Sequence, residues 1–219
     1  MKYMIFSVLL AGLLFAVPVL AEETAIQTMS YPALTTTAGQ SADIITLNIL
    51  VEEAGVKYDY CDVPTVAMLA AGVGLGGAVS GPGFHVESLT DTKQYPVGTP
   101  FKTLIVVIGA SLKGMGASGL TISDEASRTR DILAYCQENG IFVVAVHLGG
   151  EVARGPAGSD NELMIDVVAP YANYIIVTAD GNVDGRFTKI AEQRGIPLTQ
   201  IHYALDLVDV LKQAFGLAE

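Results

Sequence analysis

Three glycine-rich segments, at 36–41, 109–119 and 147–154, contain the side chains best suited to bind a ligand. Each follows an apolar stretch and combines glycine with hydroxyl, amide or charged groups. The candidate ligand-binding residues are Thr37, Gly39, Gln40, Ser41, Ser111, Lys113, Gly114, Gly116, Ser118, His147, Gly149, Gly150, Glu151 and Arg154. Glycines let backbone N–H groups approach an anion closely, and Lys113 and Arg154 add positive charge. The pattern predicts a site for a small polar or anionic molecule.

The segment 109–119 also contains the spacing Gly114-x-Gly116-x-x-Gly119, which matches the dinucleotide-binding fingerprint. Its context differs from that fingerprint, because the glycines begin several residues after the apolar stretch ends. In addition, His147 rather than an acidic residue ends the next apolar stretch. Lys113 precedes its glycine, the reverse of the order in a P-loop. Two interpretations stay open: a site for an anion or polar small molecule, and a purely structural glycine loop.

A fourth segment resembles the first half of a calcium loop. Asp180, Asn182 and Asp184 alternate along the chain and are followed by Gly185. Such alternation brings oxygen ligands together, and the glycine permits a sharp turn. The closing glutamate of a calcium loop is displaced by one residue, to Glu192. The alternatives are a Ca²⁺ site and a turn in which Asp and Asn bond to the backbone.

His147 is the candidate for proton transfer. It ends an apolar stretch and stands four residues before Glu151, so it is either a general base oriented by Glu151 or a half-buried residue at a strand end. The sequence contains no Gly-x-Ser-x-Gly elbow and no His/Cys spacing typical of zinc.

Alternating apolar segments predict the elements that position these residues. Leu104–Ile108 is continuously apolar and β-branched, as is typical of a strand buried on both faces. The expected strands are 31–36, 56–60, 104–108, 141–146, 174–177 and 198–202, and the expected helices are 41–54, 123–139, 161–168, 186–194 and 205–215. This alternation predicts an α/β fold: a doubly wound, mostly parallel sheet of five to six strands with helices on both faces, flavodoxin-like or Rossmann-like. In such folds ligands bind beyond the carboxyl ends of the strands, where the candidate segments lie.

The chain begins with features of an export signal. Residues 1–21 combine Lys2, an apolar run and small residues before a cleavage position, so we expect a cleaved signal peptide and a periplasmic or extracellular location. An uncleaved membrane anchor is the alternative. We expect a disordered segment at 22–30 and one soluble α/β domain at 31–219, with a glycine-rich insertion at about 62–100.

Composition limits the partners. The 219 residues include 12 Lys and Arg against 23 Asp and Glu, a formal net charge of −11. Because nucleic-acid affinity depends on neutralising phosphates, such a chain is not expected to bind nucleic acid. After signal cleavage no segment is apolar and long enough to span a membrane. Cys61 and Cys136 form either a disulfide or two buried thiols.

Several motifs together resemble one family. They are Thr37-Ala38-Gly39-Gln40-Ser41, Lys102-Thr103-Leu104-Ile105-Val106-Val107 leading into Ser111-Leu112-Lys113-Gly114-Met115-Gly116, and Asp180-Gly181-Asn182-x-Asp184-Gly185-x-Phe187. The chain is similar over about 31–216, except at 64–96, to exported bacterial and archaeal proteins defined only as a domain of unknown function. The resemblance implies the fold and export, and it transfers no mechanism.

Three functions are compatible with these patterns. The first is an exported binding module that holds a small polar or anionic ligand at the edge of the sheet. The second is a hydrolase or transferase that uses His147 or a carboxylate as base, with a divalent cation at Asp180 and Asp184. The third is a protein-interaction domain without a small ligand, whose contact surface is the insertion 62–100.

Overall fold

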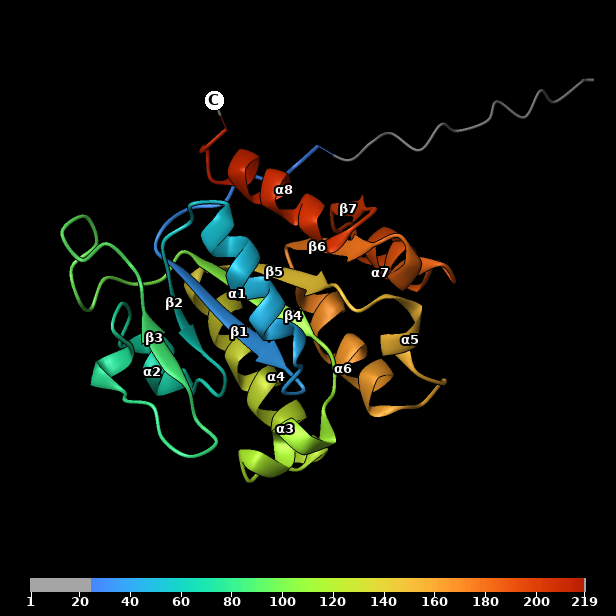
Figure 1. The fold of residues 1–219 in the computed structure, drawn as a ribbon, viewed down its shortest axis with the longest axis horizontal. Coiled ribbons are helices and arrows are strands. Elements are labelled where there is room, and N and C mark those ends of the chain that lie inside the picture. Colours follow the sequence, from blue (N-terminus) through green and yellow to red (C-terminus); the bar gives the residue numbers. More distant parts are fainter. Residues whose placement is uncertain (1–24, 219) are drawn as a thin grey trace, which may run out of the picture.

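The computed structural model describes residues 25–218, which build one seven-stranded sheet (Figure 1). The strands are β1 (Ala33–Ala38), β2 (Tyr58–Cys61), β3 (Val86–Ser88), β4 (Thr103–Ile108), β5 (Phe142–His147), β6 (Tyr174–Thr178) and β7 (Leu198–Ile201). They are ordered β3-β2-β1-β4-β5-β6-β7, and only β3 runs antiparallel to its neighbour. Every residue of β1, β4 and β6 is buried, which explains their continuous apolar or β-branched sequence.

Helices cover both faces of the sheet (Figure 1). The helices are α1 (Asp43–Glu53), α2 (Val66–Ala70), α3 (Leu112–Ala117), α4 (Ile122–Asn139), α5 (Gly150–Arg154), α6 (Asp160–Val168), α7 (Arg186–Arg194) and α8 (Leu207–Ala214). Side chains of α1 and α8 form one hydrophobic core with one face of the strands, and those of α2, α4, α6 and α7 form a second core with the other face. The α/β class with helices on both faces is therefore confirmed.

The strand number differs from the sequence-based prediction. Seven strands are present rather than five to six, because 86–88 pairs with the outer edge of β2. Its residues are exposed or half-buried, so it lacks the apolar signal of the other strands. The order reverses between β1 and β4, where chain connections leave in opposite directions, and it is consistent with a flavodoxin-like or Rossmann-like fold.

The glycine-rich segment 62–100 folds against the edge of the sheet. It contains α2, a 3₁₀ turn at Leu75–Gly77 and β3. The buried carboxylate of Asp59 accepts hydrogen bonds from the backbone N–H groups of Gly74 and Thr90, at 2.7 and 3.3 Å. A buried acceptor with two backbone donors therefore anchors this segment to β2.

Two helix starts also differ from those expected. The segment 109–119 is not an open loop, because 112–117 forms α3, capped by the Ser111 hydroxyl. The cap of α4 is Thr121 rather than Ser123, because Thr121 and Asp124 form a reciprocal capping box. Helix α4 therefore begins at Ile122, one residue before the expected start.

The start of the described chain packs on the domain. Met29 is buried and donates its N–H to the carbonyl of Ala214, at 2.8 Å, and Ser30 bonds to the hydroxyl of Thr103. These contacts hold residues 29–30 of the segment expected to be disordered at 22–30, and residues 22–24 lie outside the described residues. The expected signal peptide at 1–21 lies outside the described residues. Within residues 25–218, no helix is long and apolar enough to cross a membrane.

Candidate functional site

The first two candidate segments are joined to each other at the carboxyl ends of β1 and β4. Gln40 and Ala110 form an isolated antiparallel bridge, and the Ser118 hydroxyl donates to the Gln40 side-chain oxygen at 3.4 Å. Gly39 has a φ of +94° and lies so close to the backbone of Gly109 that a Cβ atom would clash. The two segments therefore close on each other at the carboxyl ends of β1 and β4.

A buried ion pair lies beneath this junction. Glu125 of α4 is fully buried and accepts from the N–H of Gly39 at 2.9 Å and from the Gln40 amide at 3.3 Å. The Arg128 guanidinium binds both oxygens of Glu125, at 2.6 and 2.8 Å, and also donates to the carbonyls of Thr37 and Pro64. Helix α4 thus fixes the loop after β1 through charged hydrogen bonds.

The glycines of the fingerprint-like motif serve packing here. A Cβ at Gly114 would lie 2.6 Å from the backbone oxygen of Gln40, whereas one at Gly116 would have no atom within 4 Å. Lys113 is exposed on α3, and the Ser111 hydroxyl is occupied as the helix cap. The structure therefore favours the structural interpretation of this glycine segment over a phosphate cradle.

This interpretation predicts opposite effects for two alanine substitutions in α3. Gly116→Ala should raise the free energy of unfolding by about 0.5–1 kcal/mol, because alanine is the better helix former and has room. Gly114→Ala should lower it by about 1–3 kcal/mol, since the loop after β1 must move. Urea denaturation of both variants measures the difference. Equal effects would contradict the packing role of Gly114.

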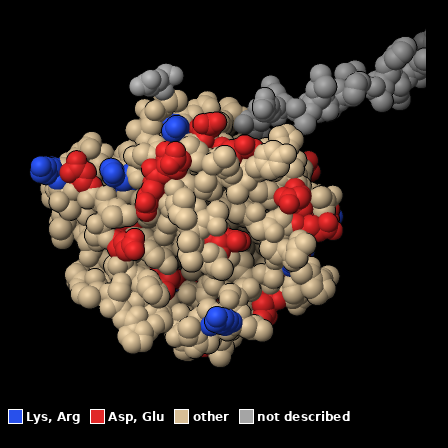
Figure 2. All heavy atoms as spheres, viewed as in Figure 1, with Lys and Arg blue, Asp and Glu red and all other residues tan. Residues whose placement is uncertain are grey.

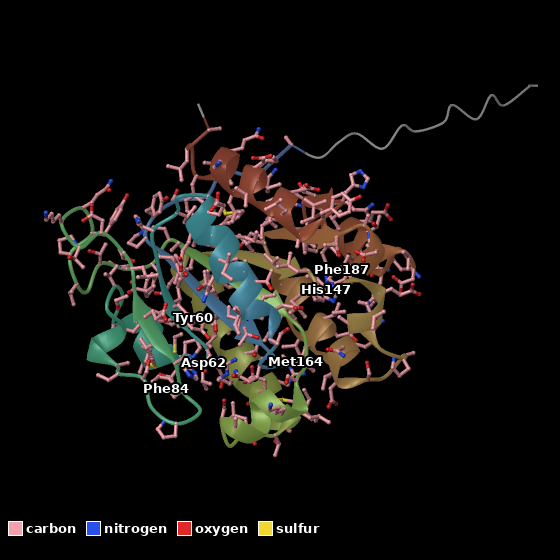
Figure 3. The ribbon with its side chains drawn as sticks, in the orientation of Figure 1. Tyr60, Asp62, Phe84, His147, Met164 and Phe187 are labelled. Atoms are coloured by element: carbon pink, nitrogen blue, oxygen red, sulfur yellow. The ribbon has the colours of Figure 1, made fainter. Side chains whose placement is uncertain are left out.

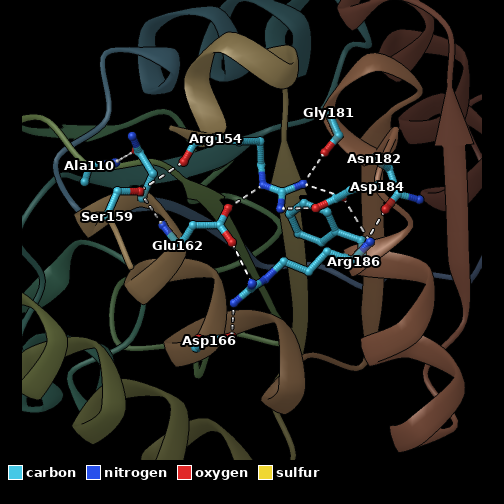
Figure 4. Close-up of polar contacts among 11 residues, drawn as sticks. Ala110, Arg154, Ser159, Glu162, Asp166, Gly181, Asn182, Asp184 and Arg186 are labelled. Carbon is cyan, nitrogen blue, oxygen red and sulfur yellow. Dashed lines mark hydrogen bonds and ion pairs between the residues drawn. The ribbon is translucent and has the colours of Figure 1, made fainter. Parts of the chain in front are cut away.

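The third and fourth candidate segments are held together by Arg154 (Figure 4). The buried Arg154 guanidinium binds Glu162 at 2.7 Å, the carbonyl of Gly181 at 2.8 Å, and both oxygens of Asp184 at 3.0 Å. Arg186 binds the other oxygen of Glu162 and one of Asp166, each at 2.6 Å. A hollow of about 210 Å³ lies here, but its arginines are already paired with carboxylates.

The calcium-like segment does not gather its three side chains around one point. Arg154 binds Asp184, and this hydrogen bond holds the pKa of the Asp184 carboxyl below its usual value. The Asn182 amide binds Thr188 and Gln200, and its oxygen caps α7 through the N–H of Phe187. Among residues 25–218, no group of three or more His, Cys, Asp or Glu side chains is arranged to hold a metal ion. A calcium site at Asp180 stays a prediction without support from this geometry.

His147 is enclosed rather than presented to a substrate. It is 1% exposed, its ring lies 5.3 Å from that of Phe187, and its Nδ1 has no hydrogen-bond partner among the described residues (Figure 3). Burial, with a smaller contribution from the Arg154 charge, lowers the pKa of His147 to about 4. Glu151 is exposed and forms no hydrogen bond with His147 among the described contacts. This geometry does not support His147 as a base oriented by Glu151.

A larger hollow of about 440 Å³ lies between α1 and the β2–β3 edge, and we call it the α1–β3 groove. It opens beside the carboxyl ends of β1 and β2. Its lining combines an isoleucine wall on α1 with polar side chains from the loop after β1 and from the β2–β3 pair. The lining residues are Thr37, Gln40, Ser41, Ile44, Ile45, Asn48, Ile49, Glu52, Tyr60, Asp62, His85 and Glu87. Three of the predicted site residues, Thr37, Gln40 and Ser41, therefore line one cavity.

The polar wall of the groove follows from strand pairing. Tyr60 pairs with Glu87 in the β2–β3 register, and side chains two residues apart share a sheet face. Asp62 and His85 therefore lie on the same face of the sheet as this pair. Tyr60 and Asp62 are labelled in Figure 3. Asp62 accepts from the His85 backbone N–H at 2.9 Å, and its second oxygen lies 3.1 Å from the ring Nδ1 of His85. Sequence reasoning missed this Asp–His pair.

Unused hydrogen-bonding groups remain on the floor of the groove. Thr37 and Ser41 are 1% and 7% exposed, and their hydroxyls accept from the N–H groups of Ser41 and Asp43. Neither hydroxyl donates to any described residue. The Asn48 amide oxygen accepts from the Thr35 hydroxyl at 2.8 Å, while its NH₂ group donates to no described residue. A ligand with an oxygen acceptor would satisfy these donors.

The two cysteines lie apart from these sites. Cys61 and Cys136 are both buried and free, and burial raises the pKa of each thiol to about 12. Both pack in the hydrophobic core that contains α4, so the alternative of two buried thiols describes this structure. Such thiols are poor nucleophiles.

The fold and site define an α/β domain with a polar groove beside the reversal point of its sheet. The chain belongs to the family described as a domain of unknown function, DUF6305, whose model matches residues 30–215. This match confirms the family resemblance. The matched residues include the segment 62–100. No curated protein and no solved structure matches the chain significantly.

Proposed function

We propose that this protein is an exported ligand-binding domain of flavodoxin-like topology that holds a small polar molecule in the α1–β3 groove. The observation that carries the proposal is the position of this cavity at the carboxyl ends of β1 and β2, lined by buried hydroxyls with unused donors. Its volume of about 440 Å³ falls in the range of small-molecule sites. The apolar run at 1–21 supports export.

The groove favours a ligand with both apolar and polar parts. Ile45 and Ile49 are 66% and 60% exposed on α1, so a bound molecule would cover apolar surface that now contacts water. Opposite them, Thr37, Ser41 and Asn48 supply donors that fix orientation. Pockets that combine such apolar walls with a few convergent polar groups are typical of small-molecule binding.

The Asp62–His85 pair supports a second candidate, a hydrolase or transferase in which His85 is the base. An aspartate on Nδ1 orients the imidazole and leaves Nε2 available. No described hydroxyl or thiol is hydrogen-bonded to His85, however, so the activated nucleophile of such an enzyme is not assembled. Binding remains the function that the geometry supports best.

The test is ligand screening of the purified protein by thermal shift and native mass spectrometry, with a variant that fills the groove. We expect a ligand at a hundred times its Kd to stabilise the protein by about 2.7 kcal/mol. Ile45→Trp should abolish this shift, because the indole would occupy the groove. Thr46→Trp, at the adjacent exposed position outside the groove, should retain it. Binding that survives Ile45→Trp and disappears in Lys113→Ala would place the site at 109–119 instead.

A further inference from the structure

The charges that line the α1–β3 groove are one-sided. Glu52, Asp62 and Glu87 contribute three carboxylates, and none of the lining residues is Lys or Arg. His85 is the single basic side chain there, and it is already paired with Asp62. On the face drawn in Figure 2, acidic side chains are spread across the surface and basic ones are few. The groove therefore lies in a negative field.

Two of these carboxylates lack a cationic partner. Glu52 accepts a hydrogen bond only from the neutral Tyr58 hydroxyl, at 2.9 Å, and Glu87 has no hydrogen-bond or ion-pair partner among the described residues. Tyr60, which pairs with Glu87, is exposed to the same field, because burial and then nearby negative charges, Asp62 first and Glu87 among them, raise the pKa of its hydroxyl. A positive group placed here would interact favourably with all three carboxylates.

The shape of the groove distinguishes an organic cation from a metal ion. Within residues 25–218, no three acidic or histidine side chains converge closely enough to hold a metal. Asp62 and Glu87 instead line one side of a cavity of about 440 Å³, and Ile44, Ile45 and Ile49, with Glu52 on the same helix, line the other. An ammonium group on an aliphatic chain matches both walls, since its charge faces the β2–β3 side and its methylenes cover the isoleucines.

From these observations we propose that the ligand of the α1–β3 groove is an organic cation, an aliphatic amine whose ammonium group lies beside Asp62 and Glu87 and within the field of Glu52. This inference rests on the proposed ligand-binding function and names its chemical class. It replaces the anionic ligand expected from Lys113 and Arg154, because Lys113 lies outside the groove and Arg154 is saturated by carboxylates. A hydroxyl or carbonyl oxygen on the same molecule would accept from Thr37 and Ser41.

The test compares three probes of similar length and different charge: putrescine, butanediol and succinate. Each is titrated into the purified ¹⁵N-labelled protein while the amide signals of groove residues are followed. We expect putrescine to shift the signals of Ser41, Asn48 and Glu87, with weaker binding at higher ionic strength. Butanediol should bind at least about tenfold more weakly, and succinate should not bind.

Isosteric variants make the test specific. Glu87→Gln and Glu52→Gln should each weaken putrescine binding about fivefold, the effect of one partly solvated charge. Glu53→Gln, the adjacent exposed position on α1 outside the groove, should leave the Kd unchanged. Groove binding of butanediol or succinate at least as tight as that of putrescine would overturn the amine inference but leave the ligand-binding function standing. Failure of all three probes to shift these signals would also overturn the amine inference, and the wider panel with Ile45→Trp would then decide the proposed function.

Discussion

Glu125→Ala should lower the free energy of unfolding by about 3–5 kcal/mol, the cost typical of removing one partner of a buried ion pair. Glu125 is fully buried, and the Arg128 side chain is 11% exposed. Without the carboxylate, the guanidinium loses its charged partner, and the N–H of Gly39 and the amide of Gln40 lose an acceptor. Urea denaturation monitored by circular dichroism measures the loss.

The matched control is Glu138→Ala, the same substitution at an exposed position of α4, which should change stability little. The double variant Glu125→Ala/Arg128→Met isolates the pair. It should lower the free energy of unfolding by less than the sum of the two single substitutions, because Arg128→Met removes the charge that Glu125→Ala leaves without a partner. If Glu125→Ala costs no more than Glu138→Ala, the pair does not hold the loop after β1. Because Gln40 lines the groove, Glu125→Ala should also weaken ligand binding there.

Much of the fold could be predicted because its signal is local. Leu104–Ile108 and Tyr174–Thr178 are buried on both faces, so their apolar runs identify them without knowledge of their neighbours. Strand β3 has no such run, because its strand character comes from pairing with β2. Helix α3 was hidden by Gly114 and Gly116, which weaken helix propensity, although only Gly114 is required by the close approach of Gln40.

Of the predicted site residues, only Thr37, Gln40 and Ser41 line the α1–β3 groove. Strand order places the glycine-rich segments at one edge of the sheet, as the parallel arrangement requires. The sequence does not show which of these segments contact each other. That depends on tertiary contacts such as Gln40 with Ala110 and Arg154 with Asp184. The Asp62–His85 pair joins residues far apart in a segment without clear periodicity. Only the β2–β3 register reveals that they share a face.

These contacts also show that one of the basic side chains expected to hold an anion is already paired within the protein. Arg154 was expected, with Lys113, to hold a negative group, but Glu162, Asp184 and the carbonyl of Gly181 use its guanidinium. Conversely, the carboxylates of Glu52 and Glu87 look like ordinary surface charges in the sequence. They line one groove only because α1 and β3 lie on its opposite sides.

The second large effect is a loss of stability in acid that depends on His147. Burial lowers its pKa to about 4 in the folded protein, against about 6.5 in an unfolded chain. Between pH 6.5 and pH 4, His147 binds a proton in the unfolded chain but not in the folded protein. The free energy of unfolding is therefore retained above pH 6.5 and falls as the pH drops towards 4. The contribution of His147 to this loss should reach about 3 kcal/mol at pH 4.

The measurement is the free energy of unfolding from pH 7.5 to 4 for the native sequence and for His147→Leu, which cannot titrate. The difference between the two curves should change by about 3 kcal/mol over this range. His202→Leu, at an exposed position, should instead run parallel to the native curve. Parallel curves for His147→Leu and the native protein would mean that His147 has the same pKa in the folded and unfolded states. That result would be incompatible with its burial against Phe187 and the Arg154 charge.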